Sequence, residues 1–118
     1  MNELKKIANQ WFDAFNAHDI NALINLYDDN AEHYSPKLKV LRPETNGLIK
    51  GKTALRDWWV DAFKRLPQLN YQVLQLTAEG NHVFMEYIRR TPGEDDLRVG
   101  EVLIFSSGKI IASRVYHS

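Results

Sequence analysis

Glu101 is the side chain of this sequence whose neighbours most favour unusual proton chemistry. Strand periodicity places it on one face with Val99, Leu103 and Phe105, in the middle of an apolar stripe. Burial in such a stripe disfavours the charged carboxylate, so its pKa should rise unless a cation lies close by. We therefore treat Glu101 as a candidate catalytic acid or base. Two alternatives remain open: a solvated position at the rim of the sheet, and a structural ion pair with Arg89.

His33 and Ser35 are a second pair of polar residues that a strand would present together. They alternate with Glu32 and Tyr34, so their side chains share one face, which the apolar first helix is expected to cover. Buried polar groups need partners, and a ligand is one kind of partner. Histidine titrates near neutral pH, so His33 would form an acid–base couple with Glu101 if the two lie within hydrogen-bond reach. The alternative is a histidine that orients a ligand or stabilises the fold.

Arg89, Tyr87 and Met85 are expected to share the inward face of another strand. An inward arginine needs a carboxylate, which is supplied either by Glu101 or by an acidic ligand. In the hairpin register that we expect, Glu101 lies opposite Tyr87 or Arg89. The alternative is an arginine whose guanidinium reaches solvent near Pro92.

Three helices precede most of the strands and position these groups. Apolar residues at helical spacing predict a first helix that ends near Ala17 and a second that is capped by Asp19 and extends to Tyr27. A third helix is expected to begin with Thr53 as its cap and to end at Pro67. Aromatic residues at helical spacing usually form core, and we also expect some to line a pocket: Trp11 and Phe15 of the first helix, and Trp58, Trp59 and Phe63 of the third.

The remaining pattern predicts a sheet. Turn residues Asp28–Asn30 lead into a strand over 31–35 that Pro36 ends. Residues 37–50 are expected to form a long loop with a short strand, a candidate lid or pocket rim. Helices followed by strands indicate an α+β fold, with three N-terminal helices packed on one face of a curved, mostly antiparallel sheet. Period-two alternation predicts its main strands over 69–78, 82–91, 97–106 and 109–117.

Length, charge and composition limit the class of protein. The 118 residues suit one domain, 1–118, and fifteen basic against fifteen acidic residues leave no net charge, which argues against a nucleic-acid or membrane partner. There is no cysteine and the four histidines lack zinc-ligand spacing, so no disulfide, metal or other cofactor is expected. No signal peptide is recognised, so a cytoplasmic location is expected. Both faces of the strand over 97–106 are partly apolar, which predicts a homodimer through the sheet.

The order of these elements resembles the NTF2-like superfamily, in particular its SnoaL-like and ketosteroid-isomerase-like small proteins. The stretches that carry the resemblance are WFDAFNAHDINALINLYDDNAEHYSP at 11–36, GKTALRDWW at 51–59 and GEVLIFSSGKIIASRVYHS at 100–118. The resemblance implies a cone-shaped half barrel wrapped around the first helix. It also implies a deep apolar pocket at the wide end and dimers formed through the outer face of the sheet.

Roles for individual positions follow from the same resemblance. Ketosteroid isomerases carry a proton on an aspartate at the end of the first strand, where this chain has Ser35. A serine without an activating base does not carry protons near neutral pH, which argues against isomerase chemistry of that type. The tyrosine and the protonated aspartate of their oxyanion hole correspond here to Trp11 and Glu101. SnoaL-type cyclases use an acid near the last strand, where the inward candidates of this chain are Ser113, Val115 and His117.

The sequence thus predicts a protein that binds a small organic ligand of apolar or weakly acidic character. As an enzyme it would carry out cofactor-free acid–base chemistry of the isomerase, dehydratase, cyclase or hydrolase type, with Glu101 and His33 as catalytic residues. The alternative is a non-catalytic ligand-binding or dimeric protein-interaction module. The residues expected to line the pocket are Trp11, Phe15, Ser35, Trp58, Trp59, Phe63, Met85, Tyr87, Arg89, Leu103, Val115 and His117.

Overall fold

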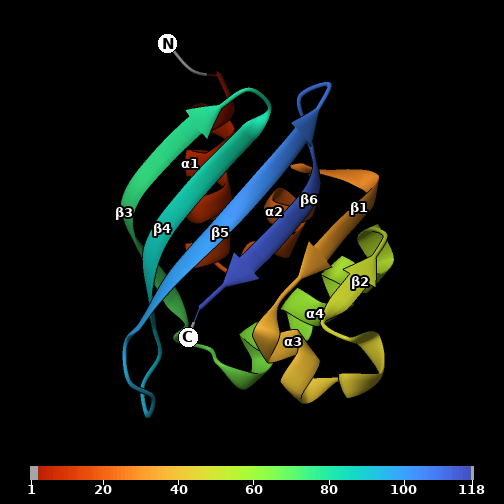
Figure 1. Ribbon diagram of the computed structural model, residues 1–118. Helices are drawn as coiled ribbons and strands as arrows, with labels where there is room; N and C mark the ends of the chain where they lie inside the picture. Colours follow the sequence, from red (N-terminus) through yellow and green to blue (C-terminus); the bar gives the residue numbers. More distant parts are fainter. Residues whose placement is uncertain (1–2, 118) are drawn as a thin grey trace.

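The computed structural model describes residues 3–117 and places helices on one side of a six-stranded sheet. In chain order the elements are α1 (Glu3–Asn16), α2 (Ile20–Ile24), β1 (Tyr27–Tyr34), α3 (Pro36–Leu41), the 3-10 turn η1 (Pro43–Thr45), β2 (Leu48–Lys50), α4 (Lys52–Arg65), β3 (Asn70–Glu79), β4 (His82–Arg90), β5 (Leu97–Ser106) and β6 (Lys109–Tyr116). Figure 1 shows α1, α2 and α4 behind the sheet. The predicted α+β class is therefore confirmed, with one more helix than expected.

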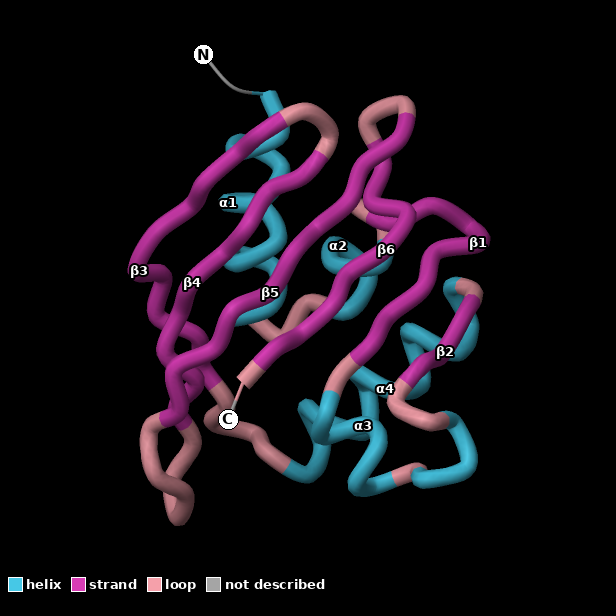
Figure 2. Tube along the Cα trace, in the orientation of Figure 1, coloured by secondary structure: helices cyan, strands magenta, loops and turns pink. Residues whose placement is uncertain are grey.

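The sheet has the strand order β2-β1-β6-β5-β4-β3. β1 and β6 run parallel, and the other neighbouring pairs are antiparallel. β3 to β6 form the predicted meander, and their bounds closely match the expected ranges. Figure 2 shows how these strands twist as they cross α1 and α2. The curvature creates an inward face that the helices cover.

α1 supplies the centre of the core because its apolar residues follow helical spacing. Trp11 and Phe15 are buried, and their ring centroids lie 5.2 Å apart in a stacked arrangement. Phe15 also stacks on Tyr71 of β3, with ring centroids 4.0 Å apart. Burial of one such aromatic side chain stabilises the fold by about 1.5–3 kcal/mol. These contacts fix α1 against the inward face of the sheet.

α2 begins as predicted but ends earlier. The Asp19 carboxylate accepts a hydrogen bond from the backbone N–H of Ala22 at 3.1 Å, which confirms Asp19 as the N-cap. Tyr27, which we expected on this helix, instead begins β1 with its side chain fully buried. Tyr27 lies three residues after Ile24, so its position also fits the spacing of a helix, which explains why we expected it on α2.

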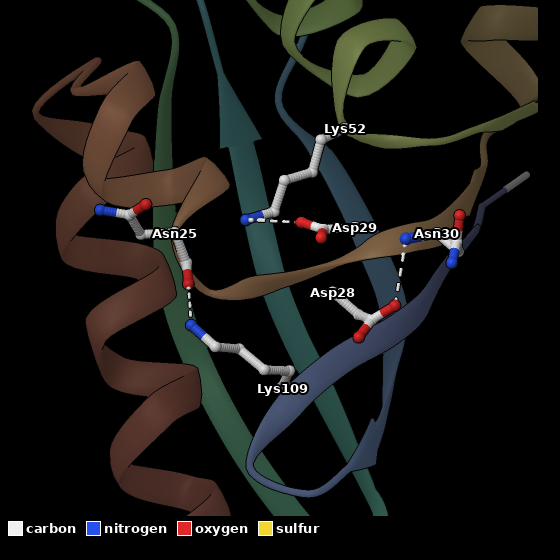
Figure 3. Close-up of polar contacts among 6 residues, drawn as sticks. All are labelled: Asn25, Asp28, Asp29, Asn30, Lys52 and Lys109. Carbon is white, nitrogen blue, oxygen red and sulfur yellow. Dashed lines mark hydrogen bonds and ion pairs between the residues drawn. The ribbon is translucent and has the colours of Figure 1, made fainter.

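β1 contains the residues that we expected to form a turn. Asp28, Asp29 and Asn30 lie within the strand, but its pairing with β6 shifts register between Tyr27 and Glu32. The Asp28 carboxylate accepts a hydrogen bond from the backbone N–H of Asn30 at 3.0 Å, a local contact typical of turns (Figure 3). Turn-forming residues here produce an irregularity within a strand that is longer than predicted.

Two lysines from distant elements contact the start of β1 and the connection that precedes it (Figure 3). Lys109 of β6 donates a hydrogen bond to the carbonyl oxygen of Asn25 at 2.6 Å. Lys52, at the start of α4, forms an ion pair with Asp29 at 3.6 Å. Because the Asp29 side chain is exposed, this ion pair adds little to stability.

The segment expected to be a long loop is largely folded. It forms α3, η1 and β2, and β2 pairs with β1 as the short strand that we predicted. The Ser35 hydroxyl accepts a hydrogen bond from the backbone N–H of Lys37 at 3.2 Å, and Pro36 occupies the first helical turn, which together explain where α3 starts. Leu38 is its one fully buried anchor. So short a helix has no periodic signal in the sequence.

α4 begins at Lys52, with Gly51 at its N-cap and no side-chain capping hydrogen bond. Thr53 therefore lies inside the helix and is not its cap, contrary to our expectation. Leu55, Trp58 and Trp59 bury the predicted apolar stripe. Within residues 3–117, no helix combines the length and the apolar character needed to span a bilayer.

The register between β4 and β5 also differs from the one that we expected. Glu101 lies opposite Met85, while Tyr87 lies opposite Val99. Hairpin register depends on the geometry of the connecting loop, here 91–96, and the alternating pattern of the strands does not specify that geometry.

Candidate functional site

A cavity of about 70 Å³ lies between α1, α4 and the inward face of the sheet. Both predicted proton carriers, Glu101 and His33, border it. Most of the predicted lining residues do so too, namely Trp11, Phe15, Ser35, Trp58, Trp59, Tyr87, Arg89, Val115 and His117. Pockets that enclose drug-sized ligands have roughly 300–1,000 Å³. This inner cavity therefore suits a very small molecule or one part of a larger one.

A second cavity, of about 260 Å³, adjoins the inner one, and we call it the mouth of the site. Val40 and Leu41 of α3, both largely exposed, border the mouth. α3 thus forms part of the rim that we expected from residues 37–50. The two cavities share Lys37, Leu41, Arg65, Leu66, Arg89 and His117.

Among the described residues, three that we expected in the lining do not border the inner cavity. Met85 and Leu103 face inward but are fully buried in the hydrophobic core. Phe63 stacks on His18, with ring centroids 4.2 Å apart. Periodicity predicts the face that a residue occupies but not its depth beneath that face, which explains these errors.

Several residues that line the inner cavity were not predicted from the sequence. Tyr71 of β3 borders the cavity and stacks on Tyr87, with ring centroids 4.2 Å apart. Alternation along 69–78 was the signal that would have identified Tyr71. Lys37 and Leu41 depend on the unexpected α3. The lining is completed by Ala62, Arg65, Leu66, Leu69 and Val99.

The Glu101 carboxyl uses only one of its two oxygens in a hydrogen bond with the described residues. Only 1% of the residue is exposed, and the Tyr87 hydroxyl donates a hydrogen bond to Oε1 at 2.7 Å. Oε2 has no hydrogen-bond partner among the described residues. Burial raises the pKa of the Glu101 carboxyl to about 7, against the opposing effect of the Tyr87 hydrogen bond. The burial excludes the rim position that we kept open.

The tyrosines beside Glu101 remain protonated donors. Burial and the nearby Glu101 charge raise the pKa of Tyr87 well above its usual value, and the same two causes raise the pKa of Tyr71. Tyr87 therefore holds Glu101 by donating a proton in the hydrogen bond, whether the carboxyl is neutral or ionised.

His33 ends a chain of buried hydrogen bonds. Trp11 Nε1 donates to the Tyr27 hydroxyl at 3.0 Å, and that hydroxyl donates to Ser113 Oγ at 3.0 Å. Ser113 Oγ lies 2.7 Å from His33 Nδ1. In the tautomer in which the Ser113 hydroxyl donates to Nδ1, Nε2 is the protonated nitrogen of His33. Trp11 uses its one donor here, so it does not polarise a ligand carbonyl.

The acid–base couple that His33 and Glu101 would form within hydrogen-bond reach is not present among the described residues. Within the described part of the chain the two share no hydrogen bond, and Ser113 is the polar partner of His33. Burial lowers the pKa of His33 to about 3, so the imidazole stays neutral at physiological pH. His33 is therefore a fixed hydrogen-bonding group in this site.

Ser35 and Arg89 also have partners of their own. The Ser35 hydroxyl caps α3, so it serves the fold. Arg89 Nη1 lies 2.6 Å from Glu94 Oε1, so Glu94 is its carboxylate partner. The pair with Glu101, one of the alternatives left open, is not formed among the described residues. Across residues 3–117, no cluster of His, Cys, Asp or Glu is large enough to hold a metal ion.

Comparison with known proteins identifies the family. The sequence profile of the SnoaL-like domain matches residues 8–113, which is most of the chain. The chain belongs to the SnoaL-like family. No curated protein matches the chain. The predicted resemblance to SnoaL-like proteins is thereby confirmed, and an NTF2-like protein from Cytophaga hutchinsonii shares the fold.

Solved structures with this SnoaL-like fold come from several bacteria. A SnoaL-like protein of unknown function from Burkholderia thailandensis is 24% identical with a TM-score of 0.89, covering 98% of this chain and 94% of that one. A provisionally assigned polyketide cyclase from Sinorhizobium meliloti is 20% identical with a TM-score of 0.79, covering 98% and 100%. A provisionally assigned ketosteroid isomerase from Kribbella flavida is 15% identical with a TM-score of 0.80, covering 98% and 78%. At these identities the likeness establishes the shared fold.

Proposed function

We propose that this SnoaL-like protein binds a small, mostly apolar organic molecule in the inner cavity and acts on it through Glu101. One observation carries the proposal: the almost fully buried Glu101 carboxyl borders a cavity, and its Oε2 has no hydrogen-bond partner among residues 3–117. Leaving such a group unsatisfied costs about 1–3 kcal/mol, a cost that a ligand hydrogen bond removes. Buried groups with shifted pKa values are concentrated at functional sites.

Glu101 can either donate or accept a proton near neutral pH, because its pKa is about 7. In its neutral form, Oε2–H would donate to a carbonyl oxygen of the ligand while Tyr87 holds Oε1. In its ionised form, Oε2 would accept a proton from the ligand. Isomerisation, dehydration, cyclisation and hydrolysis all use such transfers without a cofactor. His33 Nε2–H is a second donor that would orient the ligand.

A non-catalytic ligand-binding role is the second candidate. It is supported by Ser35, which stands where ketosteroid isomerases carry an aspartate and whose hydroxyl caps α3. Glu101 would then contribute a hydrogen bond and no proton transfer. Once a ligand is known, Glu101→Gln distinguishes the two roles. A variant that still binds the ligand but no longer converts it would support the catalytic role.

Filling the inner cavity is expected to abolish ligand binding. Val99 borders the cavity, so Val99→Phe places extra carbon atoms where the ligand would lie. Fragments that bind the wild-type protein in ligand-detected NMR should bind this variant at least about tenfold more weakly. Val73→Phe, at an exposed position on β3 that borders none of the cavities described above, is the matched control and should bind normally. Equal binding to both variants would place the fragments outside the cavity and contradict the proposal.

We further propose that the outer face of the sheet forms a homodimer. Phe84, 45% exposed, lies across Gly100, where a Cβ atom would come within 2.7 Å of the ring. Val102 lies opposite Phe84, and the exposed Tyr116 lies opposite Gly100, so the four residues form one apolar patch on neighbouring strands. Near-zero net charge does little to oppose the association of copies.

A lysine in this patch is expected to give monomers. Phe84→Lys would bury a charge in the proposed interface, so sedimentation velocity should show the dimer lost while the circular dichroism spectrum is retained. Val40→Lys, on the highly exposed part of α3, is the control and should remain dimeric. A wild-type protein that sediments as a monomer at all concentrations would rule the interface out.

A further inference from the structure

The mouth of the site carries more positive than negative charge. Lys37, Arg65 and Arg89 border it, together with one acid, Glu94. Arg65 also pairs with Asp61, at 2.8 Å. Among the described residues no acid forms an ion pair with Lys37. The mouth therefore favours an anion.

Most of the guanidinium N–H donors of Arg89 are not used in hydrogen bonds with the described residues. Its side chain is only 8% exposed, and within residues 3–117 its one side-chain hydrogen bond runs from Nη1 to Glu94 Oε1 at 2.6 Å. A guanidinium has five N–H donors in a planar arrangement that matches a carboxylate. A cation at this depth is stable only beside an anion. Arg89 therefore needs a carboxylate at the mouth, and one partner leaves most of its donors unused.

Glu94 belongs to a surface loop and not to the framework of the site. It lies in the connection 91–96, and 44% of its side chain is exposed. The hydrogen bond from Arg89 lowers the pKa of its carboxyl, and the charges of Lys37 and Arg65 act in the same direction. The mouth thus already holds a carboxylate, and it is supplied by an exposed side chain of a connecting loop.

We infer that the mouth is a subsite for the carboxylate of a small organic acid, and that Glu94 occupies this subsite until the ligand displaces it. The inference rests on the proposed function, because the apolar part of the acid is placed in the inner cavity. Exchange of one carboxylate for another keeps Arg89 paired throughout. A ligand carboxylate can accept hydrogen bonds from the Arg89 donors that Glu94 leaves unused. It can also pair with Lys37, which forms no ion pair with an acid of the described residues. A neutral or cationic ligand gains neither.

Phenylacetate and its neutral amide, phenylacetamide, are suitable probes, measured by isothermal titration calorimetry. The wild-type protein should bind phenylacetate at least about tenfold more tightly than phenylacetamide. Glu94→Gln should strengthen phenylacetate binding and leave phenylacetamide binding unchanged. The gain should be about tenfold if Glu94 is paired with Arg89 in roughly nine molecules of ten. Asp95→Asn removes the same charge from the neighbouring exposed residue and should have little effect. Lys37→Gln, at a partly exposed position, should weaken phenylacetate selectively.

The outcomes separate this inference from the proposed function. Equal affinity for the two probes, with binding lost in Val99→Phe, would overturn the carboxylate subsite and keep the ligand cavity. An equal gain in Glu94→Gln and Asp95→Asn would reveal a general charge effect and overturn the role of Glu94. Binding of both probes that survives in Val99→Phe would overturn the inner cavity as well. Arg89→Gln, if folded by circular dichroism, should abolish the preference for phenylacetate.

Discussion

Glu101→Gln is expected to become progressively more stable than the wild-type protein as the pH rises. In the folded state burial raises the pKa of Glu101 from 4.5 to about 7, so the folded protein favours the neutral acid. The neutral acid adds no cost below pH 4.5, whereas above pH 7 the folded state must bury a charge that the unfolded chain exposes to water. The wild-type protein should therefore lose about 3 kcal/mol relative to the variant between pH 4 and pH 8.

Urea unfolding of both proteins at several pH values measures this difference. Glu79→Gln, at an exposed position on β3, is the control and should follow the wild-type curve within about 0.5 kcal/mol. If the free energies of unfolding of the wild type and Glu101→Gln change with pH in the same way, the Glu101 carboxyl is solvated in the folded protein. Such a result would remove the basis for its catalytic assignment.

His33→Asn is expected to make the protein less sensitive to acid. Burial lowers the pKa of His33 from 6.5 to about 3 in the folded state, so the folded protein favours the neutral imidazole. Its contribution to stability is complete above pH 6.5 and is lost as the pH falls toward 3, since the unfolded chain binds a proton that the folded one does not. Between pH 7 and pH 4 the wild-type protein should lose about 3 kcal/mol through this residue.

Asparagine suits this test because its amide oxygen can replace Nδ1 as the acceptor beside Ser113. The variant should be less stable than wild type at pH 7, since it gives up the contact with the Trp59 ring, yet its stability should change less on acidification. His82→Asn, at an exposed position on β4, controls for the loss of a histidine elsewhere. An acid dependence that is unchanged in His33→Asn would show that another group governs acid unfolding.

Together these two effects keep both Glu101 and His33 uncharged between about pH 3 and pH 7. Glu101 resists ionisation up to about pH 7, and His33 resists protonation down to about pH 3. Within that range the buried polar groups beside Glu101 and His33, namely Tyr87, Tyr27 and Ser113, are neutral. The charged residues Lys37, Arg65 and Arg89 lie where the inner cavity meets the mouth. This separation suits a ligand with an apolar body and one charged end.

Local periodicity determined a large part of this protein from the sequence alone. Alternation placed Glu101 and His33 on inward faces, and helical spacing placed Trp11 in the core. The strands of the meander and the Asp19 cap were also found. These features depend on neighbours within one element, and such neighbours are adjacent in the sequence.

Only the tertiary structure decided how these groups are paired. Glu101 contacts Tyr87 and not Arg89, because the register of β4 and β5 is set by the loop between them. His33 contacts Ser113, 80 positions away in the sequence, because β1 and β6 run parallel side by side. Proton affinity depends on the depth of burial and on such partners. Periodicity specifies a face, and folding of distant segments onto that face specifies its chemistry.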